Sequence, residues 1–128
     1  ATVWAVDVNE RALDLVRRNA ERHGLTNINA CTPDEVPAGL GFMTIWSNPP
    51  IRVGKHELHG LLERWIPRLD ERGDAWLVVQ RNLGSDSLQR WLAATFDDGY
   101  SVARAATGRG FRVLKVRRHD APADPTPA

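Results

Sequence analysis

The chain has 128 residues, with a hydrophobic fraction of 42%, a charged fraction of 26% and a formal net charge of +1. These values indicate one compact globular domain. The small net charge gives no sign of nucleic-acid binding from the overall charge of the chain. The single cysteine, Cys31, excludes an internal disulfide framework and fits a reducing compartment, so a cytoplasmic location is expected. No apolar run approaches the roughly 20 residues of a membrane-spanning helix, so no membrane partner is expected.

The first part of the chain is predicted to be strand, helix, strand. Residues 2–7 (TVWAVD) are apolar and end in a carboxylate, which is typical of a buried parallel strand where it emerges into a loop. Asn9 can cap a helix, and Gly24 is a suitable stop for it. Residues 27–32 (NINACT) are predicted to form a second strand, and residues 33–41 a loop. The apolar positions with helical spacing are Ala12, Leu13, Val16 and Ala20.

The middle of the chain repeats this alternation. Residues 42–46 (FMTIW) predict a third strand, and residues 55–69 a helix with leucines along one face. Pro67 disfavours helical geometry at the residue before it, so a kink or an early end is expected there. Gly73 is expected to break the chain before a fourth strand over residues 75–80 (AWLVVQ).

The last part is predicted to be a helix and a hairpin. Asp86 can cap a helix that runs to about Phe96. Residues 100–106 and 111–116 predict two strands, and the turn sequence TGRG between them predicts an antiparallel hairpin. The Pro- and Ala-rich tail, residues 120–128, is predicted to be disordered. All five tryptophans lie on apolar faces and are predicted to pack in the core: Trp4, Trp46, Trp65, Trp76 and Trp91.

The order of these elements predicts an α/β fold. Alternating strands and helices imply a mostly parallel, Rossmann-like sheet with helices on both faces, followed here by a C-terminal antiparallel hairpin. Ligands of such sheets bind at the carboxyl ends of the strands. Candidate functional residues are therefore sought directly after the predicted strands.

Asp7 is the first candidate, because it ends the first strand. A carboxylate at this position can accept hydrogen bonds from both hydroxyls of a ribose. It can equally serve as a helix-capping aspartate near Asn9. Asp34, just after the second strand, could bind an adenine amino group, or could be a solvated turn residue.

The second candidate is Ser47-Asn48-Pro49-Pro50, which follows the third strand. Two prolines stiffen the backbone and remove two N–H donors, so backbone carbonyls and the Asn48 side-chain carbonyl remain as acceptors. Such a loop suits an exocyclic amine, because holding both hydrogens directs the nitrogen lone pair toward an electrophile. This is catalysis by orientation, with no nucleophilic side chain. The alternative is a plain strand-terminating turn.

Together, VDVNERALDLVRRNA and the later strand with SNPPI resemble the methyltransferase small-domain family of class I S-adenosylmethionine-dependent enzymes. The resemblance extends to GDAWLVVQRNLGSDSLQRWL and GFRVLKV and covers residues 2–118. It is similar in particular to ribosomal RNA guanine-N2 methyltransferases. The resemblance implies a methyltransferase domain over residues 1–118, a tail over residues 119–128 and a seven-stranded sheet whose terminal hairpin inserts one antiparallel strand.

The resemblance also implies roles for individual residues. S-adenosyl-L-methionine would be the cofactor, bound by Asp7, Val8, Asp34 and Asn48. Asn48 and Pro49, with Pro50, would orient the target amine, and RNA, ribosomal RNA in particular, is the expected partner. Ile51, after the prolines, could pack against a base. By position, Arg52 could meet a phosphate or be a solvated loop charge, and Arg81, which ends the fourth strand, could lie near the substrate. No metal ligand set is expected, and the oligomeric state is left open.

Two departures from the family pattern leave alternatives open. The family's opening strand and glycine-rich loop would precede residue 1, so this chain alone is expected to be inactive. Ile51 stands where such enzymes often place an aromatic residue. The alternatives are a protein glutamine N5-methyltransferase, or a non-catalytic methyltransferase-like domain that binds RNA or a partner. The basic hairpin is interpreted as an RNA-facing patch or an ordinary charged surface, through Arg104, Arg109, Arg112, Lys115, Arg117 and Arg118.

Overall fold

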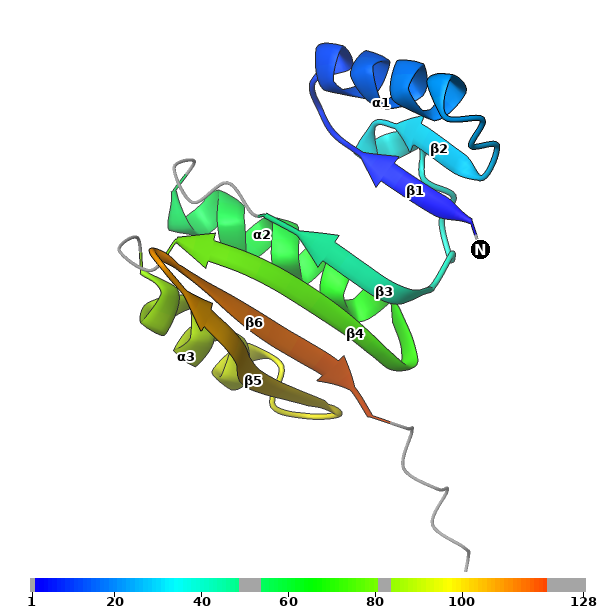
Figure 1. Cartoon of the computed structure of the whole chain (residues 1–128). Helices are drawn as coiled ribbons and strands as arrows, with labels where there is room; N and C mark the ends of the chain where they lie inside the picture. The colour runs from blue at the N-terminus through cyan, green and yellow to red at the C-terminus, as the bar shows by residue number, and fades with distance from the viewer. Residues whose placement is uncertain (1, 49–53, 81–83, 120–128) are drawn as a thin grey trace, which may run out of the picture. The chain divides into compact units, whose positions relative to one another are not determined.

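The structure, a computed structural model, describes residues 2–48, 54–80 and 84–119, in two compact units, residues 1–40 and 41–128 (Figure 1). No helix in these described ranges is long and apolar enough to cross a bilayer. The elements, in chain order, are β1 (Val3–Val6), α1 (Glu10–Arg22), β2 (Ile28–Cys31), η1 (Pro33–Glu35), β3 (Phe42–Ser47), α2 (Lys55–Trp65), η3 (Ile66–Arg68), β4 (Leu69–Gln80), α3 (Ser85–Thr95), β5 (Tyr100–Gly108) and β6 (Phe111–Arg118).

The first unit consists of a two-stranded parallel sheet and helix α1. β1 and β2 run in register from Val3 opposite Ile28 to Val6 opposite Cys31. Helix α1 begins where predicted, because the Asn9 side chain accepts the backbone N–H of Arg11 at 2.9 Å. It ends where Gly24 takes a left-handed conformation with φ +66°.

The second unit is built on a four-stranded sheet with the order β3-β4-β6-β5. β3 and β4 are parallel, whereas β6 is antiparallel to both of its neighbours. The predicted hairpin is confirmed, and its inner strand β6 is inserted as the antiparallel member. Gly108 pairs with Phe111, so only Arg109 and Gly110 connect the strands, and Gly110 supplies the positive φ of this turn.

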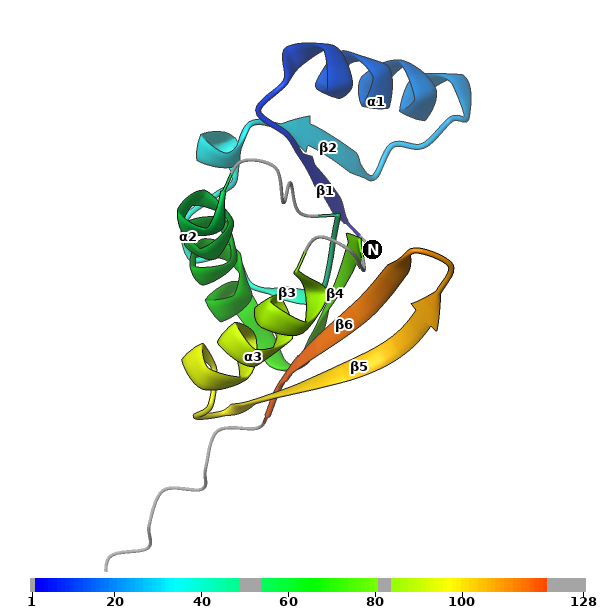
Figure 2. The ribbon, with the colours of Figure 1, turned by 90° about the vertical axis from the view of Figure 1, so that its left-hand side faces the viewer.

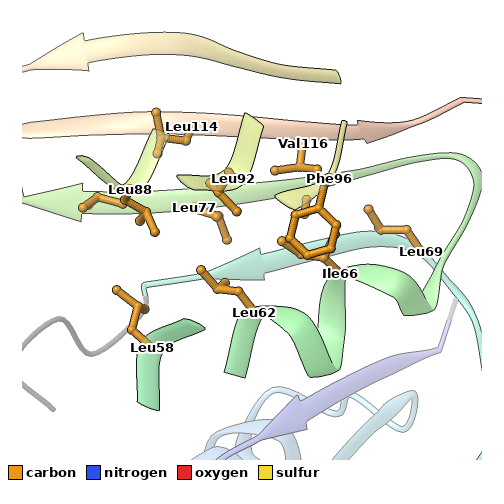
Figure 3. Packing of buried hydrophobic residues seen from close by; sticks show 12 residues of the cluster. Leu58, Leu62, Ile66, Leu69, Leu77, Leu88, Leu92, Phe96, Leu114 and Val116 are labelled. Atoms are coloured by element: carbon orange, nitrogen blue, oxygen red, sulfur yellow. The ribbon is translucent and has the colours of Figure 1, made fainter. Parts of the chain in front are cut away.

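The core of the second unit lies between the four-stranded sheet and helices α2 and α3, which occupy the same face of the sheet (Figure 2). Side chains on this face of β4 alternate with those on the other face, as expected for a strand. Ala75, Leu77 and Val79 are at most 1% exposed, and they meet Leu62 of α2 and Leu92 of α3 (Figure 3). This packing fixes both helices against the strand that ends at Gln80.

Two boundaries in this unit involve Pro67 and Gly73. Helix α2 ends at Trp65, before Pro67 in the short η3 turn, so the expected early end is confirmed, and Leu69 belongs to the next strand. The break expected at Gly73 is wrong. β4 begins at Leu69 and runs through Gly73. A Cβ at Gly73 would lie 2.9 Å from the Phe42 carbonyl oxygen, so glycine allows a close approach of two strands instead of ending one.

Two predicted side-chain roles are also wrong. Gly84 is the N-cap of α3, and Asp86 lies in the first turn and does not cap the helix. Trp46 is 67% exposed and stacks on Trp76 across the face of the sheet opposite to the helices, so it is not a core residue. The α/β, Rossmann-like fold class with antiparallel C-terminal strands is confirmed, with the described strands divided between two sheets. The predicted tail, residues 120–128, lies outside the described residues.

Candidate active site

Asp7 lies directly after β1 and takes part in the local structure that starts α1. Its backbone N–H donates to the Cys31 carbonyl at 3.2 Å, which extends the pairing of the two strands by one bond. Its Oδ1 accepts the backbone N–H of Asn9 at 2.9 Å. Oδ2 has no partner in the described part of the chain, and the side chain is exposed. Capping and ligand binding are therefore compatible, because they use different oxygens of one carboxylate.

Asp34 comes to the same end of the two-stranded sheet as Asp7. Val6 pairs with Cys31, so the residues after these two parallel strands emerge side by side. Asp34 follows within η1 and is exposed. Val8 is 81% exposed beside Asp7. The structure thus brings together the three cofactor-binding candidates of the first unit.

Glu35 shapes this corner and was missed in the sequence. Its Oε1 accepts the backbone N–H and the hydroxyl of Thr32, each at 2.9 Å, in a capping box. These hydrogen bonds from Thr32 hold the pKa of the Glu35 carboxyl below its usual value. The spacing of Thr32 and Glu35 is the sequence signal for this motif. The box fixes the turn that carries Asp34.

Asn48 belongs to the second unit and directly follows β3. Ser47, the last residue of β3, pairs with Leu77 of β4, so Asn48 lies at the carboxyl end of this parallel pair. Its side chain is exposed. Pro49, Pro50, Ile51 and Arg52, and also Arg81 after β4, lie outside the described residues.

A charged cluster lies near the carboxyl end of β4. Arg112 is 4% exposed, and its Nη1 donates to Asp86 Oδ1, which Arg104 also contacts at 3.4 Å. The hydrogen bond and positive charge of Arg112 lower the pKa of the Asp86 carboxyl. The interpretation of Arg112 as surface charge is therefore wrong. The sequence around Arg112 gave no sign of its burial, because its partner Asp86 lies on another element, α3.

The chemistry available at these positions is that of hydrogen-bond acceptors. Carboxylates of Asp7 and Asp34 accept from hydroxyl or amino groups, and the Asn48 amide can accept through its oxygen. The Cys31 thiol is buried, and burial raises its pKa, which disfavours the reactive thiolate. Within residues 2–48, 54–80 and 84–119 there is no group of three or more His, Cys, Asp or Glu side chains that could hold a metal ion.

Comparison with known protein families identifies the family of this α/β chain. The profile of the methyltransferase small domain matches residues 1–115. The chain belongs to the methyltransferase small domain family. The family consists of class I S-adenosylmethionine-dependent enzymes, as the resemblance of the SNPPI region implied. A relative from Bacillus subtilis (strain 168), the uncharacterized protein YbxB, is 33% identical over 120 residues. These residues are 91% of this chain and 58% of that protein, so the chain spans little more than half the length of its relative.

Solved structures show the same fold. A methyltransferase from Pyrococcus furiosus matches with a TM-score of 0.71 and 23% identity, over 93% of this chain and 64% of that one. The T. thermophilus 16S rRNA N2 G1207 methyltransferase RsmC, solved in complex with AdoMet and guanosine, matches with a TM-score of 0.63. The two sequences are 18% identical, and the match covers 98% of the present chain and 38% of RsmC. These likenesses establish the methyltransferase small domain as a Rossmann-like fold.

Proposed function

We propose that the protein is an S-adenosylmethionine-dependent methyltransferase that acts on an exocyclic amino nitrogen, with guanine N2 of ribosomal RNA as the substrate. Residues 1–118 are proposed to form its methyltransferase domain, and its place of action is proposed to be the cytoplasm. The observation that carries the proposal is the position of Asn48, in a family of methyltransferases, directly after a parallel strand and before two prolines.

The cofactor part of the proposal rests on the first unit. Asp7 and Asp34 follow two adjacent parallel strands, and Asp7 retains Oδ2 for a ligand hydroxyl. Such a pair of exposed carboxylates fits the ribose hydroxyls and the adenine amino group of S-adenosylmethionine. When bound, this cofactor supplies an electrophilic methyl group on a sulfonium, so that a carbon–nitrogen bond forms as the carbon–sulfur bond breaks.

The substrate part rests on Asn48. Its side-chain oxygen would accept one hydrogen of the target amine, and a backbone carbonyl of the Pro49-Pro50 segment the other. Both contacts draw the amine lone pair out of conjugation with the base and direct it toward the methyl carbon. The methylated nitrogen is cationic and then loses one of its own two protons to solvent. Because the amine itself attacks the methyl carbon, no side chain has to act as a nucleophile. The RsmC likeness supports guanine as the base, since RsmC is named for guanosine N2 methylation in 16S rRNA.

The test is methyl transfer by the intact protein from S-adenosylmethionine with a labelled methyl group. Ribosomal RNA and total cell protein are offered in separate reactions, and the RNA is digested to nucleosides for mass spectrometry. The proposal expects N2-methylguanosine, and Asn48→Ala should abolish it. Asn19→Ala, at an exposed position of α1, is the matched control and should retain activity.

Other outcomes of this experiment would reject the proposal. Label in a glutamine side chain of a protein would instead identify a protein glutamine N5-methyltransferase. No label in either substrate, together with no heat of S-adenosylmethionine binding in calorimetry, would identify a non-catalytic domain.

A further inference from the structure

One buried arginine connects three elements of the second unit. Arg112 of β6 is 4% exposed, and its guanidinium donates to the carboxylate of Asp86 in the first turn of α3. Arg104 of β5 approaches the same oxygen at 3.4 Å. The start of α3 is therefore held to both strands of the hairpin by charge-assisted hydrogen bonds.

The position of this ion pair is near the carboxyl end of the parallel strands. Arg112 pairs with Val79, and Phe111 with Gln80, the last residue of β4. β3 runs parallel to β4, so its final residue, Ser47, points to the same end of the sheet. Asn48 comes next. The ion pair and the proposed amine-orienting residue thus lie at the same end of one sheet.

The chemistry of the pair indicates a role in geometry more than in stability. The Arg112 side chain is 5% exposed, and its Nε finds no acceptor in the described part of the chain. Burying a guanidinium removes its hydration, and an incomplete set of partners does not restore it fully. The partner Asp86 is 64% exposed, so an apolar side chain in place of Arg112 leaves no buried charge unpaired and should cost little stability. An apolar side chain cannot replace the directional hydrogen bond to Asp86, which sets the position of the start of α3.

The start of α3 is in turn packed with the start of α2. Leu88, within the first turns of α3, and Leu58, within the first turn of α2, are buried in the same cluster and lie at the same end of it (Figure 3). Helix α2 is the element that follows Asn48 in the chain. A displacement of the α3 start would therefore be transmitted through this packing to the helix that follows the proposed amine site.

We propose that Asp86 and Arg112 are positioning residues for the amine substrate, which set the start of α3 at the end of the sheet that carries Asn48. This inference rests on the proposed function, and it adds residues that do not touch the reacting atoms. Loss of the pair should weaken productive substrate binding. Cofactor binding should persist, because its ribose and adenine contacts are assigned to Asp7 and Asp34 of the other unit.

The test compares Arg112→Met with Arg118→Met in the intact protein. Arg118 is a matched control, because it is another arginine of β6 and is partly buried. It donates to the carbonyls of Pro67 and Leu69 at the opposite end of β4. Five quantities are measured: the urea midpoint, the Kd of S-adenosylmethionine, kcat and KM for the RNA, and hydrogen exchange of the Leu88 amide. This amide donates to the Gly84 carbonyl at 2.9 Å, so its exchange reports on the first turn of α3.

For Arg112→Met we expect an unchanged or higher urea midpoint, an unchanged cofactor Kd, faster Leu88 exchange and a KM on the order of tenfold higher. Arg112→Lys keeps the charge without the planar fork and should recover part of the KM. Arg118→Met should change neither KM nor Leu88 exchange. An unaltered KM in folded Arg112→Met protein, or an equal rise in Arg118→Met, would overturn the proposal.

The two proposals fail in different ways. If the wild-type protein methylates no amine, the proposed function is lost, and the substrate role of the pair is lost with it. Hydrogen exchange of the Leu88 amide still tests whether the ion pair positions the start of α3. Faster exchange in Arg112→Met but not in Arg118→Met supports this, and unchanged exchange in Arg112→Met overturns it.

Discussion

Asp7 and Asn9 form two linked hydrogen bonds at the corner between β1 and α1. Asp7 Oδ1 accepts the Asn9 N–H at 2.9 Å, and Asn9 Oδ1 accepts the Arg11 N–H at the same distance. The first bond closes the turn after the strand, and the second caps the helix. One short segment therefore both starts a helix and presents a carboxylate at the carboxyl ends of two parallel strands.

Asp7→Asn separates these two roles. The amide oxygen can still accept the Asn9 N–H, so the unfolding midpoint should not change. The negative charge and one acceptor are lost, and hydrogen bonds to charged groups contribute about 1.5–3 kcal/mol. We therefore expect the Kd of S-adenosylmethionine, measured by calorimetry, to rise at least about tenfold. Asp14→Asn, at an exposed position of α1, is the control. Equal cofactor affinity in both variants would argue against a ribose contact by Asp7.

Asn9→Ala removes the helix cap and should act on stability. The Arg11 N–H loses its side-chain acceptor, and loss of such a cap costs about 1 kcal/mol. The free energy of unfolding of the first unit, measured in urea by the signal of helix α1, should fall by that amount. Asn9→Asp keeps an acceptor at the cap and should remain close to wild type. A full-size loss in Asn9→Asp would mean that capping is not the cause.

Leu92→Ala should be among the most destabilising single changes in the second unit. Leu92 is completely buried between α3 and the sheet, and truncation leaves a cavity that the packed strands do not fill. The expected loss in free energy of unfolding is about 2–5 kcal/mol by urea titration. Met43→Ala, at a residue that is 58% exposed, should cost under about 1 kcal/mol. Comparable losses in the two variants would contradict the placement of the core.

The parts of this fold that could be predicted have local causes. Asn9 and Gly24 mark the ends of α1 because capping involves residues that are neighbours in sequence. The β5–β6 hairpin follows from Gly110 in its turn. The joint position of Asp7 and Asp34 follows from the parallel pairing of two adjacent strands. In each case the pattern and its structural partner lie within a few residues or within one strand–helix–strand unit.

The parts that could not be predicted depend on remote contacts. Gly73 was predicted to break the chain, but it permits the close approach of the Phe42 backbone. Phe42 lies on another strand, so the sequence around Gly73 does not indicate this contact. Trp46 reads as a core residue, but exposure is decided by which face of the sheet the helices cover. Asp86 reads as a cap, but its partner Arg112 comes from β6. The roles of Asn48, Pro49 and Pro50 toward a substrate stay predictions for the same reason.

The Thr32–Glu35 capping box predicts a specific pH dependence. Hydrogen bonds from the Thr32 backbone and hydroxyl stabilise the ionised carboxylate, so the pKa of Glu35 in the folded protein is below the ordinary 4.5. A carboxyl with a depressed folded pKa adds stability above its unfolded pKa, and this stability is lost as the pH falls through the folded pKa. Glu35→Gln should therefore reduce the free energy of unfolding at pH 7 and reduce its decline below about pH 4.5.

Urea titrations of the wild-type protein and Glu35→Gln at a series of pH values from neutral to acidic test this directly. The two curves should be furthest apart at neutral pH and should converge as the pH falls, since protonation of Glu35 removes the same interaction that the variant lacks. Glu21→Gln, at an exposed position of α1, controls for the change in net charge. A constant difference between wild type and Glu35→Gln at every pH would show that the ionised Glu35 does not stabilise the turn that carries Asp34.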